Sequence, residues 1–90
     1  MLVHGHITWF EGRGARAAAS SRKEYRGVTY DSTDGSGWSI WITWADEINP
    51  VGIKLLVSGK EPELFVSGKS LPVYEGATKI AEVICCYETH

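Results

Sequence analysis

The sequence predicts an all-β protein, a small closed or nearly closed antiparallel β-barrel of six to seven strands that forms a single domain over residues 1–90. Short stretches of alternating apolar and polar residues recur along the chain, and this period of two is typical of a half-buried strand. Turn-forming residues separate these stretches at the short spacings found in sandwiches and small barrels. A chain of 90 residues with 43% hydrophobic and 22% charged residues is long enough for one compact domain and too short for two.

The alternating pattern predicts both the strands and their buried faces. The expected strands are residues 2–10, 25–31, 37–45, 52–58, 63–67, 70–74 and 79–88. The side chains expected to point inward are Val3, Ile7, Trp9, Trp38, Ile40, Ile42, Trp44, Ile53, Leu55, Val57, Val73 and Val83, with Ala81, Cys85 and Tyr87 on the same face of the last strand. The segment ARAAASSRKEY contains good helix formers but no apolar face, so we expect at most a helical turn there and no packed helix.

The stretch GWSIWITW holds three tryptophans in eight residues. At helical spacing they would form one aromatic stripe, whereas in a strand Trp38 and Trp44 share one face and Trp41 lies on the other. We favour the strand, because the stretch is short, is rich in aromatic and β-branched residues, and lies between turn formers. Trp41 is then expected on the outer face, either covered by a loop or available as an anchor for a partner.

No apolar run approaches the roughly 20 residues of a membrane span, and the N-terminus lacks the pattern of a signal peptide. Cys85 and Cys86 are adjacent and would face opposite sides of a strand, which argues against a disulfide framework. We therefore expect a soluble cytoplasmic protein with no membrane partner.

The net charge of −2 predicts no partner, but the charges are unevenly distributed. All the arginines precede residue 27, and nine of the eleven acidic residues lie outside the segment 11–26. This basic segment contains Arg13, Arg16, Arg22, Lys23 and Arg26. It should make one end or loop of the protein locally positive.

The basic segment and Trp41 are the candidate binding sites. Guanidinium groups fork onto phosphates and stack on bases, and Tyr25 beside Arg26 adds an aromatic surface of the kind that RNA uses. A solvated basic loop without a ligand explains the same residues equally well. An exposed tryptophan is also a favoured anchor in protein interfaces.

Two histidines raise the question of a metal. His4 and His6 lie two residues apart and would project from one face of the first strand, and a third ligand from His90, Glu82 or Glu88 would complete a zinc or copper site. Two solvated histidines on an outer face are the simpler interpretation. We expect no metal and no cofactor.

Signatures of catalysis and of nucleotide binding are weak. Neither cysteine has the local motif of a catalytic nucleophile, and Gly12 and Gly14 are not followed by the helical pattern of a dinucleotide site. The phrase VSGK at 57–60 and 66–69 lacks the spaced glycines of a phosphate loop and indicates turns at strand ends. We expect a protein that is not an enzyme, and we infer no small-molecule substrate.

The order of motifs resembles the C-terminal β-barrel domain of translation elongation factor Tu and its small stand-alone relatives. HGHITWF is followed by EGRGAR, where the family has a Glu-Gly-Gly-Arg turn, and EYRG occupies the place of Gly-Tyr-Arg-Pro. NPVGIKLLV and LPVYEGATKIAEVI are similar to the later strand and the closing hairpin, with Glu75 and Gly76 at the turn. The chain departs from the family at Gly27, in place of proline, and at Ala77-Thr78-Lys79 in the closing turn.

The resemblance implies a stand-alone binding module that contacts RNA or a translation-related protein, since the family's barrel contacts the aminoacyl-tRNA stem and partner proteins. Arg16, Tyr25 and Arg26 match motif positions. The alternative is an immunity or inhibitor protein that blocks a toxin or enzyme, because such proteins are short and acidic and cover a basic site with surface aromatics and carboxylates.

Overall fold

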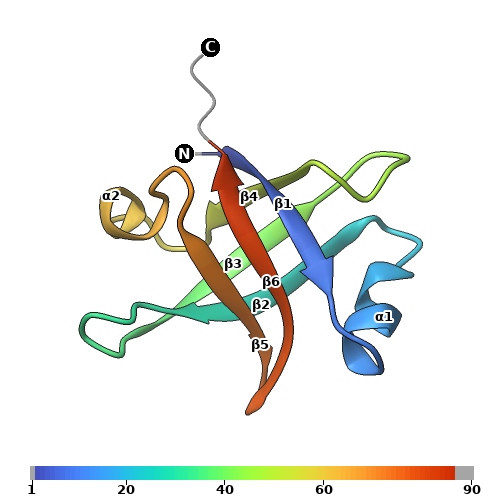
Figure 1. Ribbon diagram of the computed structural model, residues 1–90, viewed down its shortest axis with the longest axis horizontal. Coiled ribbons are helices and arrows are strands. Elements are labelled where there is room, and N and C mark those ends of the chain that lie inside the picture. Colours follow the sequence, from blue (N-terminus) through green and yellow to red (C-terminus); the bar gives the residue numbers. More distant parts are fainter. Residues whose placement is uncertain (1, 87–90) are drawn as a thin grey trace.

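The computed structural model describes residues 2–86 and shows a closed antiparallel barrel of six strands, which confirms the predicted fold class. The elements in chain order are β1 (Val3–Trp9), α1 (Arg13–Ala18), β2 (Glu24–Tyr30), β3 (Gly37–Thr43), β4 (Val51–Leu55), α2 (Glu61–Leu64), β5 (Ser70–Glu75) and β6 (Thr78–Cys86). Around the barrel the strands follow the order β1-β4-β3-β2-β5-β6, and β6 pairs with β1 to close it. The two short helices lie on opposite sides of the barrel (Figure 1).

The strand expected at 63–67 is wrong, because this part of the chain begins inside the short helix α2 and continues as a loop. Leu64 and Phe65 are adjacent and both are buried, at 0% and 1% exposure. A strand would point them to opposite faces, whereas a helical turn followed by a bend brings both into the core. Pro62 fits the first turn of α2, where no backbone N–H is needed.

The inward position expected for Val57 is also wrong, since its side chain is 68% exposed. β4 ends at Leu55, and the chain then leaves the sheet toward α2. Leu56 N still donates a hydrogen bond to the Ser39 carbonyl at 3.0 Å, but its side chain faces solvent. Alternation beyond the last paired residue therefore carries no information about burial.

The remaining inward predictions within residues 2–86 are confirmed. The buried core contains Val3, Ile7, Ile40, Ile42, Val51, Ile53, Leu55, Leu64, Phe65, Leu71, Val73, Ile80, Ala81, Val83 and Cys85. Trp9, Trp38 and Trp44 are half-buried and pack against this core. Tyr87, expected on the same face as Cys85, lies outside the described residues.

One side of the barrel is covered by α1, although no packed helix was expected. The helix reaches β1 and β6 through Gly14, which is buried and so close to the Ile80 carbonyl that a Cβ would collide with it. A helix without an apolar face can therefore dock by its backbone. Beneath it the Trp9 ring lies edge-on to Tyr25 and Trp44, with centroids 5.9 and 5.7 Å away.

The side chain of Asn49 extends the pairing of β1 past Val51, the first residue of β4. Asn49 Oδ1 accepts a hydrogen bond from Ile7 N at 2.7 Å, and Asn49 Nδ2 donates one to the Ile7 carbonyl at 3.0 Å. The amide group thus takes the place of a strand residue opposite Ile7. The loop before β4 is fixed to β1 by these two bonds.

We expect Asn49→Ala to lower the free energy of unfolding by about 1–3 kcal/mol, because it leaves the backbone groups of Ile7 without partners. Urea denaturation measures the change. Glu47→Ala, an exposed position in the same loop, is the control and should change little. Equal effects of the two substitutions would contradict the role given to Asn49.

An ion cluster joins the β2–β3 hairpin to the start of α2. The Lys60 ammonium lies 3.1 Å from Asp31 Oδ2 and 3.0 Å from Asp34 Oδ2. Asp31 is buried and accepts a hydrogen bond from Thr33 N, and this bond, together with Lys60, holds the pKa of Asp31 below its ordinary value. Bonds from Ser36, with a further contribution from Lys60, lower the pKa of Asp34 in the same way.

We expect the stabilising effect of Lys60 to weaken in acid. Both aspartates have folded-state pKa values below the ordinary 3.8, so their contribution is complete above pH 3.8 and is lost as the pH falls through the lower folded values. Lys60→Met should therefore lower Tm at pH 7, and its difference from wild type should shrink below pH 3.8. Thermal unfolding from pH 7 to pH 2.5 measures this.

The control for this experiment is Lys23→Met, which removes an exposed ion pair with Asp46 and should change Tm little at any pH. A difference between Lys60→Met and wild type that stays constant down to pH 2.5 would show that the cluster does not act through its carboxylates.

Candidate binding surfaces on the outside of the barrel

A groove forms where α1 faces the turn between β5 and β6. Arg13 and Arg16 lie three residues apart on one side of α1, and Tyr25 follows at the start of β2. With Glu75 and Gly76 of the turn they line a hollow of about 600 Å³, which we call the arginine groove. The fold thus brings together three residues of the predicted basic site.

The turn that forms the far wall is the closing hairpin expected from the sequence. Glu75 pairs with Thr78, and Gly76 takes a positive φ of 61° in the two-residue connection. Glycine adopts this conformation without strain. At this position it also adds no side chain to the lining of the groove.

Tyr25 is half-buried between the groove and the Trp9 ring. Burial raises the pKa of its hydroxyl, Glu75 raises it further, and Arg13 opposes the shift. The phenol is therefore neutral at physiological pH and acts as a hydrogen-bonding group. The charge of the groove comes from its arginines and Glu75.

The groove continues along the line between β2 and β5. In the described part of the chain these strands pair at one position, Val28 with Tyr74, and they diverge on either side of it. A second hollow of about 380 Å³ shares Tyr25, Glu75 and Gly76 with the first and adds Arg26 to its lining. A cationic path therefore runs from α1 across β2.

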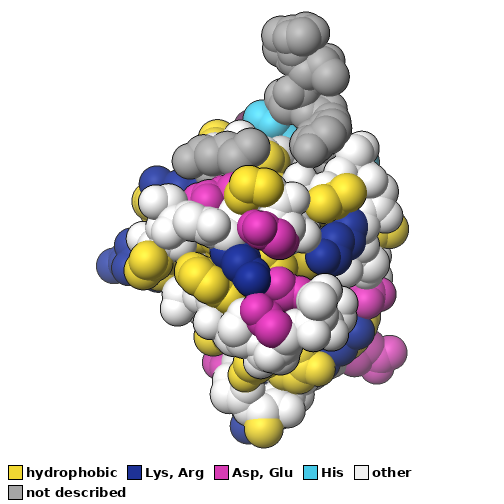
Figure 2. Space-filling view, turned by 90° about the vertical axis from the view of Figure 1, so that its left-hand side faces the viewer, with side chains coloured by type: hydrophobic (Ala, Val, Ile, Leu, Met, Phe, Trp, Pro, Cys, Tyr) yellow, Lys and Arg dark blue, Asp and Glu magenta, His cyan; other side chains and the backbone are white. Residues whose placement is uncertain are grey.

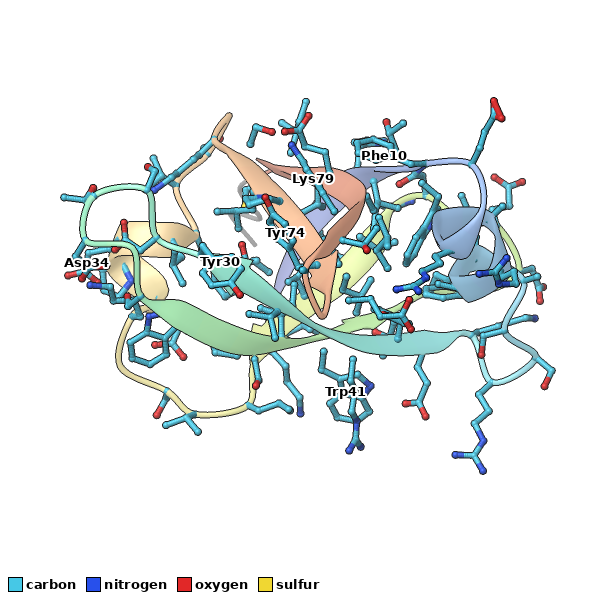
Figure 3. The ribbon with its side chains drawn as sticks, turned by 90° about the horizontal axis from the view of Figure 1, so that it is seen from below. Phe10, Tyr30, Asp34, Trp41, Tyr74 and Lys79 are labelled. Carbon is cyan, nitrogen blue, oxygen red and sulfur yellow. The ribbon has the colours of Figure 1, made fainter. Side chains whose placement is uncertain are left out.

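Trp41 projects from the outer face of the barrel, as the strand interpretation predicts (Figure 3). The strand register places Arg26 of β2 and Lys54 of β4 directly opposite it on either side. The Arg26 guanidinium lies 5.1 Å and the Lys54 ammonium 4.3 Å from the ring centroid. The indole N–H donates to Glu24 Oε1 at 2.8 Å. We call Arg26, Trp41 and Lys54 the Trp41 ladder.

Two residues of the predicted basic site lie apart from both surfaces. Lys23 forms an ion pair with Asp46, with Nζ 3.0 Å from Oδ1, and Arg22 is exposed in the loop between α1 and β2. Neither lines the arginine groove or the ladder. The basic segment therefore does not act as one loop: its cations are divided among a groove, a sheet face and a surface ion pair.

Sequence reasoning missed Lys54 and Glu75. Alternation places Lys54 outward, but only the register between β3 and β4 shows that it lies beside Trp41. Glu75 was identified as a turn residue, and its position in the groove depends on how the hairpin approaches α1. Both placements follow from pairing between distant segments, which a local pattern does not contain.

The histidine pair finds no partners for a metal among the described residues. His4 is half-buried and His6 exposed on β1, and no group of three or more His, Cys, Asp or Glu residues within 2–86 lies close enough to hold an ion. Glu82 is instead bonded to Lys79 at 3.1 Å. The other candidates, Glu88 and His90, lie outside the described residues.

The face over α2 has a different character. Figure 2 shows basic and acidic side chains interspersed there, with hydrophobic side chains scattered among them. The Lys60 cluster accounts for part of this mixture. None of the helices within residues 2–86 is long and apolar enough to cross a membrane.

No protein-family model, curated protein or solved structure matches the chain.

We expect Trp41→Ala to cost about 1 kcal/mol of stability, because Trp41 is half-buried on the outer face, where within residues 2–86 it makes two cation–π contacts and one hydrogen bond and no contact with the core. Trp38→Ala and Trp44→Ala should each cost about 2–4 kcal/mol, since these rings pack against the core. Urea denaturation of the three variants tests the assignment. Equal losses would show that Trp41 is a structural residue rather than an available surface.

Proposed function

We propose that the protein is a non-catalytic RNA-binding module that holds the RNA backbone in the arginine groove. The observation that carries the proposal is the gathering of Arg13, Arg16 and Tyr25 in one hollow, with Arg26 on its continuation. These residues come from α1 and β2, so their convergence is a property of the fold and not of local sequence. The resemblance to the elongation factor Tu barrel supports the same class of partner.

The chemistry of the groove suits a polyanion that also carries hydroxyl groups. Guanidinium groups bind phosphates through two parallel hydrogen bonds, and the neutral Tyr25 hydroxyl suits a ribose 2′-hydroxyl or a phosphate oxygen. Three arginines line the two hollows against the single carboxylate of Glu75, which leaves an excess of positive charge. This excess stands out in a chain whose net charge is −2.

The alternative, an inhibitor that covers a basic site, receives less support from the same surfaces. Such a protein needs carboxylates around its aromatic anchor. Trp41 is flanked instead by Arg26 and Lys54, and the nearby Glu24 is bonded to its indole N–H. We place the RNA-binding module in the cytoplasm, where a cysteine side chain such as that of the buried Cys85 stays reduced.

We expect Arg13→Glu/Arg16→Glu to weaken RNA binding by at least about tenfold near 0.1 M salt. The slope of log K against log salt should become shallower by about 0.7 for each single-strand phosphate that the variant no longer neutralises. Fluorescence anisotropy with a labelled oligouridylate, and with a hairpin RNA of equal length, measures both effects.

The matched control is Arg22→Glu/Lys23→Glu, which makes the same charge change in the same region but outside the groove. It should retain most of the wild-type affinity. Equal weakening by both double variants would reduce the effect to net charge, and failure of the wild type to bind either RNA would refute the proposal. Turnover of a small substrate would show that the protein is an enzyme after all.

A further inference from the structure

We propose that the Trp41 ladder is a second binding surface, and that its partner is an acidic segment of another protein that inserts one aliphatic side chain. The ladder lies on the outer face of β2, β3 and β4, whereas the arginine groove lies between α1 and the β5–β6 turn. Arg26 touches both surfaces, while Lys54 belongs to the ladder alone.

The charge of the ladder selects an anionic partner. Arg26 and Lys54 place two positive charges on either side of one ring, and neither forms a salt bridge within residues 2–86. Glu24 contributes one carboxylate, whose Oε1 is already bonded to the indole N–H. Arg26 and Lys54 are separated by β3, and the Trp41 ring between them compensates each charge only in part. Carboxylates from a partner would complete the compensation.

Beside the ladder lies a hollow that fits an aliphatic side chain. Its walls are Leu2, Trp41, Thr43 and Lys54, and its volume is about 220 Å³. The outer face of β4 is open here because Gly52 carries no side chain, and Leu2 lies across it, so that a Cβ on Gly52 would be 3.3 Å from Leu2 Cδ1. Leu2 is nevertheless 55% exposed, which leaves apolar surface available next to the two cations.

The geometry favours a protein segment over RNA at this face. Aromatic side chains bind single strands chiefly by stacking flat on the bases. Arg26 and Lys54 approach the Trp41 ring from the strands on its two sides, so a base would have to displace a cation before it could stack. Carboxylates reach both cations without disturbing the ring, and the hollow receives the accompanying apolar group.

The experiment titrates 15N-labelled full-length protein with the blocked peptide Asp-Glu-Asp-Leu-Asp-Glu and records the indole N–H signals, with that of Trp41 assigned from Trp41→Phe. Two control peptides replace the acids by Asn and Gln, or the Leu by Gly. We expect saturable shifts of the Trp41 indole and of the Thr43 and Lys54 amides with the acidic peptide. The control peptide in which Asn and Gln replace the acidic residues should not bind, and the one in which Gly replaces Leu should bind more weakly.

The test variant is Lys54→Glu and its control is Lys79→Glu. Lys79 also lies over an aromatic ring, 5.9 Å from the Phe10 centroid, but on the opposite side of the molecule from Trp41 (Figure 3). We expect Lys54→Glu to weaken binding of the acidic peptide by about tenfold or more. Lys79→Glu should leave the affinity for this peptide unchanged. The dispersion of the amide spectrum shows whether each variant is folded.

Three outcomes would overturn the proposal: no shift at about 1 mM peptide, the weak end of specific binding; equal weakening by both lysine variants; and displacement of the peptide from Trp41 by oligouridylate in the groove variant Arg13→Glu/Arg16→Glu, which would assign the face to nucleic acid. Because Arg13→Glu/Arg16→Glu leaves Lys54 and Trp41 intact, this variant should still bind the peptide. The failure of one surface is therefore distinguishable from the failure of the other.

Discussion

Closure of the barrel depends on the single residue pair between β2 and β5. The other neighbouring strands are joined by ladders of three pairs or more, whereas Val28 and Tyr74 alone join these two within the described chain. On one side of this pair, Tyr30 packs edge-on against Tyr74 at 5.1 Å, and both rings line a separate hollow of about 380 Å³ (Figure 3). On the other side the strands part, and the hollow that adjoins the arginine groove lies in the opening. The position of the proposed RNA site thus follows from where the sheet closes least completely.

Alternation was sufficient to predict the class of the fold and most of its core, because a strand that is half-buried must present its apolar residues with a period of two. It was also sufficient to place Trp41 outside while Ile40 and Ile42 lie inside at 0% exposure. It failed at α2 and at Val57. There, burial is decided by how the chain crosses between β4 and β5, and Leu64 and Phe65 enter the core from a helical turn that has no strand period.

The candidate sites were predictable as residue types but not as groups. The basic segment suggested one continuous cationic loop, yet α1 turns Arg13 and Arg16 toward the groove, while β2 points Arg26 to the outer face. Lys23 pairs with Asp46, which lies 23 residues later in the sequence. Each assignment depends on the strand register or on the docking of α1 through Gly14, and both are long-range properties that a single sequence does not state.

The charges around Tyr25 and Trp41 distinguish the two partners that we propose, RNA and an acidic protein segment. Tyr25 of β2 and Trp41 of β3 are both half-buried aromatic residues, and both lie next to arginine. Tyr25 lines a groove with its hydroxyl near charges of both signs, which suits a backbone of phosphates and hydroxyls. Trp41 has its ring flanked by two cations and an apolar hollow at its edge, which suits carboxylates with an aliphatic neighbour. Arg13, Arg16, Arg26 and Lys54 lie on these two adjoining surfaces, so the partners that we propose for both are anionic. Because Arg26 touches both surfaces, we expect binding at one to affect binding at the other.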